Sequence, residues 1–174
     1  MAKVSLKQID IDEKTVIREL QHNSNENIDK IAKRCKFSRQ KVWRIIKKLE
    51  NNHTIWGYHA IVDNDRLNLK RYVILLKKTS QPAGRLVDTI LSREIERRAT
   101  EIGVTIHTSI YLHGTFDWFI LFTAENIRHA KKFCEQLKFI YQDYLNEIYL
   151  IEEIFPVKNC GIQNPNINKL KDFV

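Results

Sequence analysis

Residues 37–50 read FSRQKVWRIIKKLE, and this stretch has the pattern of a short amphipathic helix. Ser38 is a favourable N-cap because its hydroxyl can accept a hydrogen bond from a free backbone N–H of the first turn. Apolar residues recur at spacings of three and four, which predicts one stripe facing a core. The stripe consists of Val42, Ile45, Ile46 and Leu49. Five cations lie largely off this stripe, and no acid interrupts them before Glu50. Such a helix suits the major groove of DNA, although a solvated basic face on an ordinary surface helix would have the same pattern.

The residues before this helix predict two more helices. Residues 12–22 indicate a first helix with Asp12 as its cap, and residues 27–35 a second one capped by Asn27. Because only a tight turn separates the last two helices, the three together predict a helix-turn-helix whose third helix is the reading element. Residues 54–62, TIWGYHAIV, are rich in β-forming residues and predict a strand or small wing.

The periodicity changes after a polar, turn-prone segment, which we interpret as a linker at residues 64–70. It separates a DNA-binding domain at residues 1–63 from a second domain at 71–158, and a tail follows at 159–174. Apolar runs and alternation predict strands at 72–76, 104–112, 116–122 and 148–157, and helical spacing predicts helices at 81–102 and 126–144. The order β-α-β-β-α-β predicts a ferredoxin-like sandwich with both helices on one face of the sheet. The fold class is therefore α+β, with an N-terminal winged helix-turn-helix and a C-terminal ferredoxin-like βαββαβ sandwich.

The opposite face of the predicted sheet also carries large apolar residues. Phe119, Leu121, Tyr149 and Ile151 cannot all lie on the helix side. We therefore expect a second subunit to cover this face and make a dimer.

Composition restricts the compartment and the kind of partner. The net charge of +8 makes a polyanion a plausible partner, and no apolar run is long enough to cross a membrane. Three widely separated cysteines, Cys35, Cys134 and Cys160, fit neither a disulfide framework nor a zinc site. Six histidines lack the spacing of metal ligands. We expect a cytoplasmic protein with no metal, no cofactor and no membrane partner.

Several segments resemble the leucine-responsive/AsnC (feast-famine, or Lrp/AsnC) family of bacterial and archaeal transcription regulators. These are IDEKTVIRELQHN (11–23), IAKRCKFS (31–38), VWRIIKKLE (42–50) and IWGYHAIVD (55–63), and HGTFDWFIL (113–121) is similar to that family's Gly-x-Tyr-Asp turn. The match runs without gaps over residues 11–69 and resumes in the sheet domain. The resemblance implies a DNA-binding winged helix-turn-helix joined to an effector-sensing domain. That domain makes dimers and often octamers in the family, and small molecules, typically amino acids, bind between such domains.

The sequence departs from the family pattern at several positions. Lys36 and His53 stand where the family usually has Gly, so positive φ angles there would strain the backbone. The helix between the first two sheet strands looks about two turns longer than usual. Phe116 replaces the usual Tyr and removes a hydroxyl.

Two sets of candidate binding residues follow. For DNA, we expect base-edge or groove contacts from one group of residues on the capped helix and phosphate contacts from another. The first group is Arg39, Gln40, Lys41, Trp43 and Arg44, the second is Lys36, Lys47 and Lys48, and Ser38 caps the helix. Trp43 could equally be a packing residue. For an effector, the candidate residues are His113, Gly114, Phe116 and Asp117. A tight β-turn, with Gly for its backbone and Asp for a local hydrogen bond, would explain that segment equally well.

No catalytic constellation stands out in the sequence. It offers no nucleophile–base pair, no glycine-rich phosphate loop and no paired carboxylates at a mapped cleft, so we expect a regulator and not an enzyme. The expected function is sequence-specific DNA binding, with double-stranded DNA, a homodimer or octamer and an amino-acid effector as partners. One alternative is an architectural protein that binds DNA with little sequence preference. Another is a siroheme-decarboxylase-like enzyme, since those enzymes are built on a similar two-domain plan.

Overall fold

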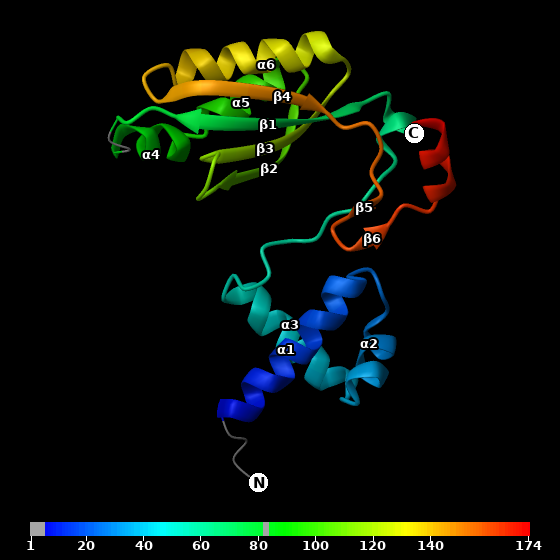
Figure 1. Cartoon of the computed structure of the whole chain (residues 1–174). Helices are drawn as coiled ribbons and strands as arrows, with labels where there is room; N and C mark the ends of the chain where they lie inside the picture. Colours follow the sequence, from blue (N-terminus) through cyan, green and yellow to red (C-terminus); the bar gives the residue numbers. More distant parts are fainter. Residues whose placement is uncertain (1–5, 82–83) are drawn as a thin grey trace. The chain divides into compact units, whose positions relative to one another are not determined.

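The computed structural model describes residues 6–81 and 84–174, with only the backbone described for Leu6 and Arg85 (Figure 1). The chain divides into two compact units. The first contains the residues up to Ile61 together with Val157–Leu170, and the second contains Val62–Pro156 together with Lys171–Val174. None of the helices in the described ranges is both long and apolar enough to cross a bilayer.

Three helices form the core of the first unit, as predicted. They are α1 (Leu6–His22), α2 (Ile28–Cys35) and α3 (Arg39–Asn51). Val16 of α1, Ile31 of α2 and Val42 of α3 are buried together in one cluster. Asn27 caps α2 by accepting a 2.8 Å hydrogen bond from the N–H of Asp29, which confirms that prediction.

The predicted start of the first helix is wrong. α1 begins at Leu6, six residues before Asp12, because no helix-breaking residue lies between them. Asp12 is therefore inside the helix. Its carboxylate accepts a 3.0 Å hydrogen bond from the side-chain amide of Gln8, one turn earlier.

The strand predicted at residues 54–62 is not formed. This segment has no regular secondary structure, and no described strand pairs with it. The N–H of Ile55 bonds to the carbonyl of Leu49 at 3.0 Å, which ties the start of the segment to the end of α3. Without a partner strand, the β-forming side chains of this segment have no ladder to join.

The first unit also contains part of the C-terminal segment, which forms a small hairpin. Its strands are β5 (Lys158–Asn159) and β6 (Ile162–Gln163), and Gly161 in the turn has a φ of 84°. A 3-10 helix, η2 (Ile167–Asp172), follows.

The second unit has the predicted ferredoxin-like sheet. After a 3-10 turn, η1 (Asn64–Leu67), come β1 (Lys70–Lys78), β2 (Thr105–Tyr111), β3 (Trp118–Ala124) and β4 (Leu145–Glu152). The order in the sheet is β2-β3-β1-β4, and every neighbouring pair is antiparallel. Alternate residues such as Tyr72, Ile74 and Ile120 are buried against α5 (Glu94–Glu101) and α6 (Ile127–Ile140). Asn126, the first residue of the helix predicted at 126–144, caps α6, and the helix ends earlier than predicted, at Ile140.

The single helix predicted over residues 81–102 is wrong, because the chain forms two helices, α4 (Gly84–Leu91) and α5. Arg93 adopts a left-handed backbone with φ 56°, which no continuous helix allows. The hydroxyl of Ser92 donates to the carbonyl of Thr89 at 2.7 Å, which is the local side-chain bond that competes with a helix. Pro82 and Ala83, near the predicted start of this helix at residue 81, lie outside the described residues.

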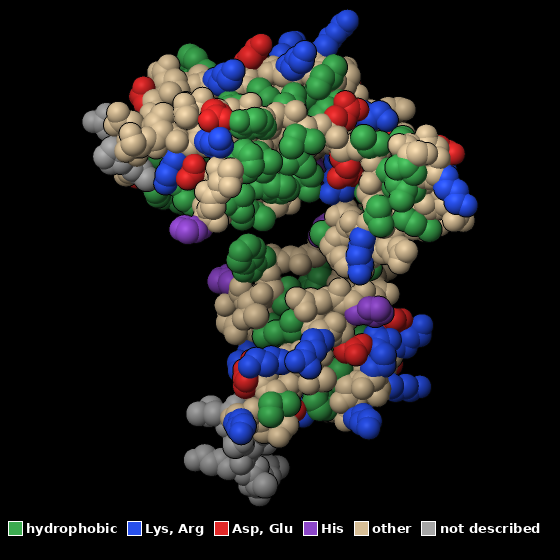
Figure 2. Space-filling model, in the orientation of Figure 1, with side chains coloured by type: hydrophobic (Ala, Val, Ile, Leu, Met, Phe, Trp, Pro, Cys, Tyr) green, Lys and Arg blue, Asp and Glu red, His purple; other side chains and the backbone are tan. Residues whose placement is uncertain are grey.

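The face of the sheet opposite the helices carries two apolar rows. The first crosses all four strands and the second crosses β3, β1 and β4. One row runs Ile110–Phe119–Leu75–Tyr149 and the other contains Leu121, Val73 and Ile151, by the strand register. Tyr149 and Ile151 remain 43% and 46% exposed. In the space-filling view, hydrophobic side chains gather on the exposed surface of the sheet unit (Figure 2).

Candidate nucleic-acid interface

The turn between α2 and α3 is held by two backbone devices. Lys36 adopts a left-handed conformation with φ 56° and ψ 40°, which ends α2 and points the chain into the turn. The next N–H, that of Phe37, bonds back to the carbonyl of Ala32 at 2.9 Å, a pattern that closes the last turn of a helix. Ser38 then caps α3 by accepting from the N–H of Lys41 at 3.2 Å, which confirms the predicted cap.

The buried side of α3 determines which side faces outward. Val42, Ile46 and Leu49 are buried in the first unit. Because each residue turns an α-helix by about 100°, the positions opposite this stripe can be identified from the spacing alone. They are Gln40, Arg44, Lys47 and Asn51, with Trp43 beside them, and all five are exposed. We call these five residues the reading face.

Two lysines of α3 are held by neighbouring acids of α1. The Nζ of Lys41 lies 2.6 Å from Oδ2 of Asp12, and the Nζ of Lys48 lies 2.5 Å from Oε1 of Glu13. Lys41 and Lys48 are seven residues apart, so they point to the same side of the helix. We call these two ion pairs the α1–α3 clamp. It fixes α3 against α1 along a line that is different from the reading face.

Asp12 is the buried member of the clamp, with only 5% of its surface exposed. The hydrogen bond from Lys41 lowers the pKa of the Asp12 carboxyl, an effect that burial opposes and the Gln8 amide reinforces. The Nζ of Lys41 also lies 3.8 Å from the centre of the Phe37 ring. Lys41 therefore has a salt-bridge partner and an aromatic partner within its own domain, and its predicted contact with a base remains untested.

The other predicted DNA-binding residues differ in how firmly they are engaged. Nη1 of Arg39 lies 3.5 Å from Asp29, and Nζ of Lys47 lies 2.8 Å from Glu50, both at exposed positions where such pairs are weak. Within the described ranges, no hydrogen bond or ion pair engages the side chains of Lys36, Gln40, Trp43 or Arg44. Trp43 is 52% exposed, so it is not the core residue that the alternative interpretation would require.

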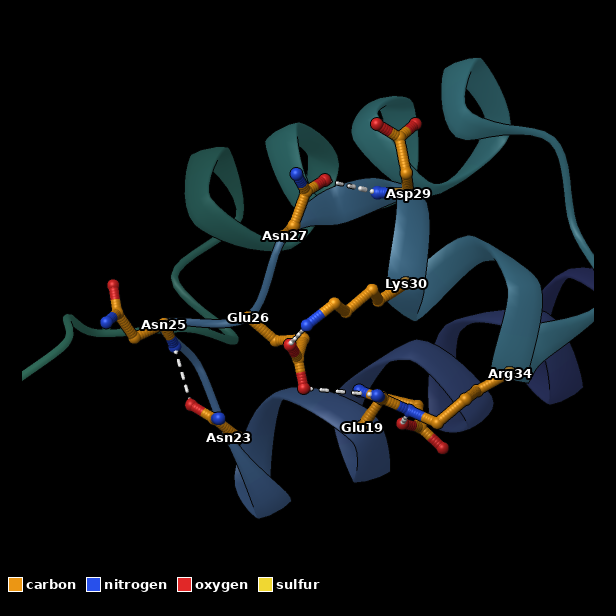
Figure 3. Close-up of polar contacts among 8 residues, drawn as sticks. All are labelled: Glu19, Asn23, Asn25, Glu26, Asn27, Asp29, Lys30 and Arg34. Atoms are coloured by element: carbon orange, nitrogen blue, oxygen red, sulfur yellow. Dashed lines mark hydrogen bonds and ion pairs between the residues drawn. The ribbon is translucent and has the colours of Figure 1, made fainter.

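A group of charged residues stiffens the connection between α1 and α2 (Figure 3). The guanidinium of Arg34 donates to Glu19 at 2.5 Å and to Glu26 at 3.2 Å, and Lys30 pairs with Glu26 at 3.2 Å. These cations lower the pKa of Glu26, with the Lys30 bond as the largest cause. The group holds α2 in place, and α2 in turn carries the turn that presents α3.

Sequence reasoning missed the clamp acids and Asn51. A helix that starts at residue 12 makes Asp12 a cap, and this prediction hides the pairing of Asp12 and Glu13 with the lysines of α3. Asn51 follows Arg44 by seven residues, and that spacing was the available signal that both lie on one face.

The predicted effector residues lie at the turn between β2 and β3. The carboxylate of Asp117 accepts from the backbone N–H of Lys78 at 2.9 Å, and its Oδ1 lies 3.8 Å from the Lys78 ammonium. Gly114 has a φ of 152°, and His113 is exposed. The side chain of Asp117 thus ties the turn to the end of β1, 39 residues earlier in the chain, and this is not the local hydrogen bond expected of a tight β-turn. Its oxygens remain partly accessible.

Phe116 leads from this turn onto the open face of the sheet. Its ring meets that of Tyr149 edge-on, with 5.4 Å between the centroids. Close by, the Lys77 ammonium lies 3.1 Å from Glu147 and 5.7 Å from the Phe116 centroid. The Glu147 carboxylate raises the pKa of Lys77, so this group stays positive. The structure therefore brings Phe116 together with the cation of Lys77 and the carboxylate of Glu147. It does not place His113 in this group.

Comparisons with known proteins agree with this architecture. A family model described as winged helix-turn-helix DNA-binding matches residues 13–55. A search of curated proteins found no match. Among solved structures, an AsnC family transcriptional regulator from Agrobacterium tumefaciens has 18% identity and a TM-score of 0.61, covering 85% of this chain and 92% of that one.

Two further solved structures carry an amino acid. A transcriptional regulator of Neisseria meningitidis, in complex with L-methionine, has 14% identity and a TM-score of 0.63 and covers 90% of this chain and 94% of that one. A feast or famine regulatory protein of M. tuberculosis, also complexed with L-methionine, has 16% identity and a TM-score of 0.61 and covers 85% and 95% of the two chains. The chain thus has the two-domain α+β fold of the Lrp/AsnC regulators, which confirms the predicted fold class and the resemblance.

Proposed function

We propose that this protein is a DNA-binding transcription regulator of the Lrp/AsnC type that reads its operator with the reading face of α3. The observation that carries the proposal is that different residues of α3 hold the helix in the domain and project from it. The α1–α3 clamp and the buried stripe hold the helix, and Gln40 and Arg44 project with no protein partner among the described residues. Arg suits the O6 and N7 acceptors of guanine, and Gln suits the N6 and N7 edge of adenine.

The remaining cations of the domain fit contacts to the DNA backbone. Lys36 at the turn and Lys47 on the reading face are exposed, and a phosphate can replace the weak surface partner of Lys47. We assign Lys48 a secondary role, because Glu13 already holds it at 2.5 Å.

The test is binding of the full chain to a duplex selected from random sequences, compared with a scrambled duplex. Arg44→Ala is expected to weaken specific binding by about 1–3 kcal/mol, the worth of one bidentate base contact, and to relax preference at one base pair. Arg18→Ala is a matched control, since Arg18 is an exposed arginine on α1. Equal losses for both variants, with base preference intact, would refute the assignment of the reading face.

We further propose that two copies assemble through the open face of the sheet. The two apolar rows offer a self-complementary surface of the kind that isologous dimers bury. A dimer would present two copies of α3 to a roughly palindromic operator, with half-sites about one helical turn, ~34–36 Å, apart or a multiple of it. Analytical ultracentrifugation of the free protein tests the dimer, and its titration with operator tests the spacing. An octamer would appear in the same measurement as a higher mass.

For the effector, we propose an amino acid bound near the turn of residues 113–117. The support is the placement of Phe116 beside both an ammonium, Lys77, and a carboxylate, Glu147, groups of opposite sign that match the two charges of an amino acid. Calorimetric titration with the common amino acids tests this. Phe116→Ala should weaken binding of the one that responds, and an unaltered affinity would place the site elsewhere.

An architectural protein is the second candidate function, and the same DNA titration distinguishes it. It predicts a steep dependence on salt with no preferred sequence. We propose a regulator that acts in the cytoplasm and catalyses no reaction, with its three free thiols suited to a reducing compartment.

A further inference from the structure

A second basic surface lies on α6, in the sheet unit and away from the reading face in the chain. α6 packs through Ala130, Phe133 and Leu137, all completely buried. The opposite side of the helix carries four exposed cations and one exposed acid, Glu135. The cations are Arg128, Lys131, Lys132 and Lys138, and we call them the α6 stripe. Lys and Arg side chains gather along the edge of the sheet unit where α6 lies (Figure 2).

The α6 stripe has no acidic partner, whereas most other cations of the sheet unit do. The pairs are Lys70 with Asp65, Arg71 with Glu153, Lys77 with Glu147, Arg97 with Glu101 and Arg98 with Glu94. Arg93 and Lys171 also have no ion pair among the described residues, but they are single residues on different segments. No acid within the described ranges lies within ion-pair distance of any of the four stripe cations. The helix therefore keeps four positive charges available to an external anion.

The three stripe cations in the first half of α6 are unfavourably placed for folding, whereas Lys138 in the last turn suits the helix dipole. The first turn of α6 contains Arg128 and His129 and no acid, and Lys131 and Lys132 follow at once. Cations near the N-terminus of a helix oppose its dipole, which favours negative charge there. Lys131 and Lys132 also lie three and four residues from Arg128, so like charges are neighbours on the surface. A bound polyanion would relieve both unfavourable terms.

We propose that the α6 stripe binds the phosphate backbone of duplex DNA outside the segment read by α3. From Arg128 to Lys138 the helix rises about 15 Å, at ~1.5 Å per residue. One strand of B-DNA presents a phosphate every ~3.4 Å along its axis, so the α6 stripe spans about four phosphates. Lysines in this setting act as point charges. The neighbouring amides are already engaged, because Gln136 accepts from Arg98 at 3.0 Å and Asn126 caps α6. It therefore lengthens the DNA contact without adding sequence preference.

This inference depends on duplex DNA being the partner, as proposed above, but not on how α3 reads it. The test therefore uses the full chain in two backgrounds, wild type and the reading-face variant Gln40→Ala/Arg44→Ala. In each background the α6 stripe is neutralised as Arg128→Gln/Lys131→Gln/Lys132→Gln/Lys138→Gln. The matched control removes the same charge elsewhere in the sheet unit, as Arg66→Gln/Lys70→Gln/Arg97→Gln/Lys171→Gln.

The measurement is affinity for a 60-base-pair duplex of random sequence over a series of NaCl concentrations. Each phosphate contact contributes about 0.9 to the slope of log K against log salt, so neutralising the α6 stripe should reduce the slope by about 3 to 4. The control should keep most of the wild-type slope. The same difference is expected in the reading-face background, where sequence-specific binding has been removed. Equal slopes for the stripe variant and the control would overturn the inference.

The outcomes of the two proposals can be separated. A sequence preference that persists in the Gln40→Ala/Arg44→Ala background, with a slope that still depends on the α6 stripe, would count against the reading face and support the stripe. Circular dichroism checks that the neutralised helix folds. Acetylation of the wild-type protein, followed by mass spectrometry, tests the inference without mutation. DNA should protect Lys131 and Lys132 from acetylation and leave Lys171 reactive. Equal modification of all three with and without DNA would also overturn the inference.

Discussion

The left-handed residue at the end of α2 gives a prediction that separates stability from DNA binding. Lys36 has a φ of 56°, a region in which the Cβ of an L residue crowds the backbone. That crowding costs about 1–2 kcal/mol per residue. Glycine avoids it but loses about 0.5–1 kcal/mol through its greater freedom in the unfolded chain. Lys36→Gly should therefore raise the free energy of unfolding by about 0.5–1 kcal/mol.

The control is Lys36→Ala, which removes the same charge and keeps the Cβ. Urea unfolding followed by circular dichroism should place the alanine variant near wild type and the glycine variant above both. If the whole chain unfolds together, the gain corresponds to a rise in Tm of about 1–4 °C. A glycine variant no more stable than the alanine variant would refute the argument from backbone strain.

The same pair of variants tests the predicted phosphate contact. Both lose the ammonium, so both should weaken operator binding equally and reduce the salt slope by about 0.9. A glycine variant that is more stable yet binds DNA as weakly as the alanine variant would separate the two effects. Unchanged affinity in both would remove Lys36 from the interface.

Three further predictions concern the clamp and the sheet. Lys41→Met should lower the free energy of unfolding by about 1–3 kcal/mol, because it leaves the buried Asp12 carboxylate without its cation; a loss no larger than that from an exposed lysine would contradict the clamp. The lowered pKa of Asp12 means that its contribution is complete above the ordinary carboxyl pKa near 4 and is lost as pH falls through the lowered value. Stability measured between pH 5 and pH 2 should thus fall less steeply in Asp12→Asn than in wild type, and identical slopes would speak against it. Ile151→Arg should shift the sedimenting species towards monomer while the control Leu91→Arg, on α4, should not, and an unchanged mass in Ile151→Arg would exclude the open face as the dimer interface.

Much of the fold could be predicted because local signals and tertiary packing agree. The caps at Asn27, Ser38 and Asn126 are short polar side chains directly before apolar periodic runs, and each forms the expected hydrogen bond. The sheet order follows from the alternation of helical and strand periods, since only a few topologies bury such a pattern. These features depend on neighbours within a few residues.

The predictions of secondary structure are wrong where a contact in the folded chain outweighs the periodicity of the apolar residues. Residues 84–101 keep helical spacing throughout, yet the left-handed Arg93 divides them, and nothing in the spacing reveals that break. Residues 54–62 have strand-forming side chains but no partner strand in the described chain. For the candidate interface, periodicity identified the residues that project from α3. It could not predict that Lys41 and Lys48 would be paired, because their partners lie 29 and 35 residues earlier in the chain.

The clamp has a consequence for how this protein could acquire new operators. The residues that hold α3 in place and the residues that project from it are different sets on different sides of one helix. Gln40, Trp43 and Arg44 are exposed, and no hydrogen bond or ion pair within the described ranges engages their side chains. Substitutions at these three positions can therefore accumulate while the domain keeps its shape. The protein could therefore change the operator sequence it recognises through a few codon changes in α3, without repacking the core of the domain.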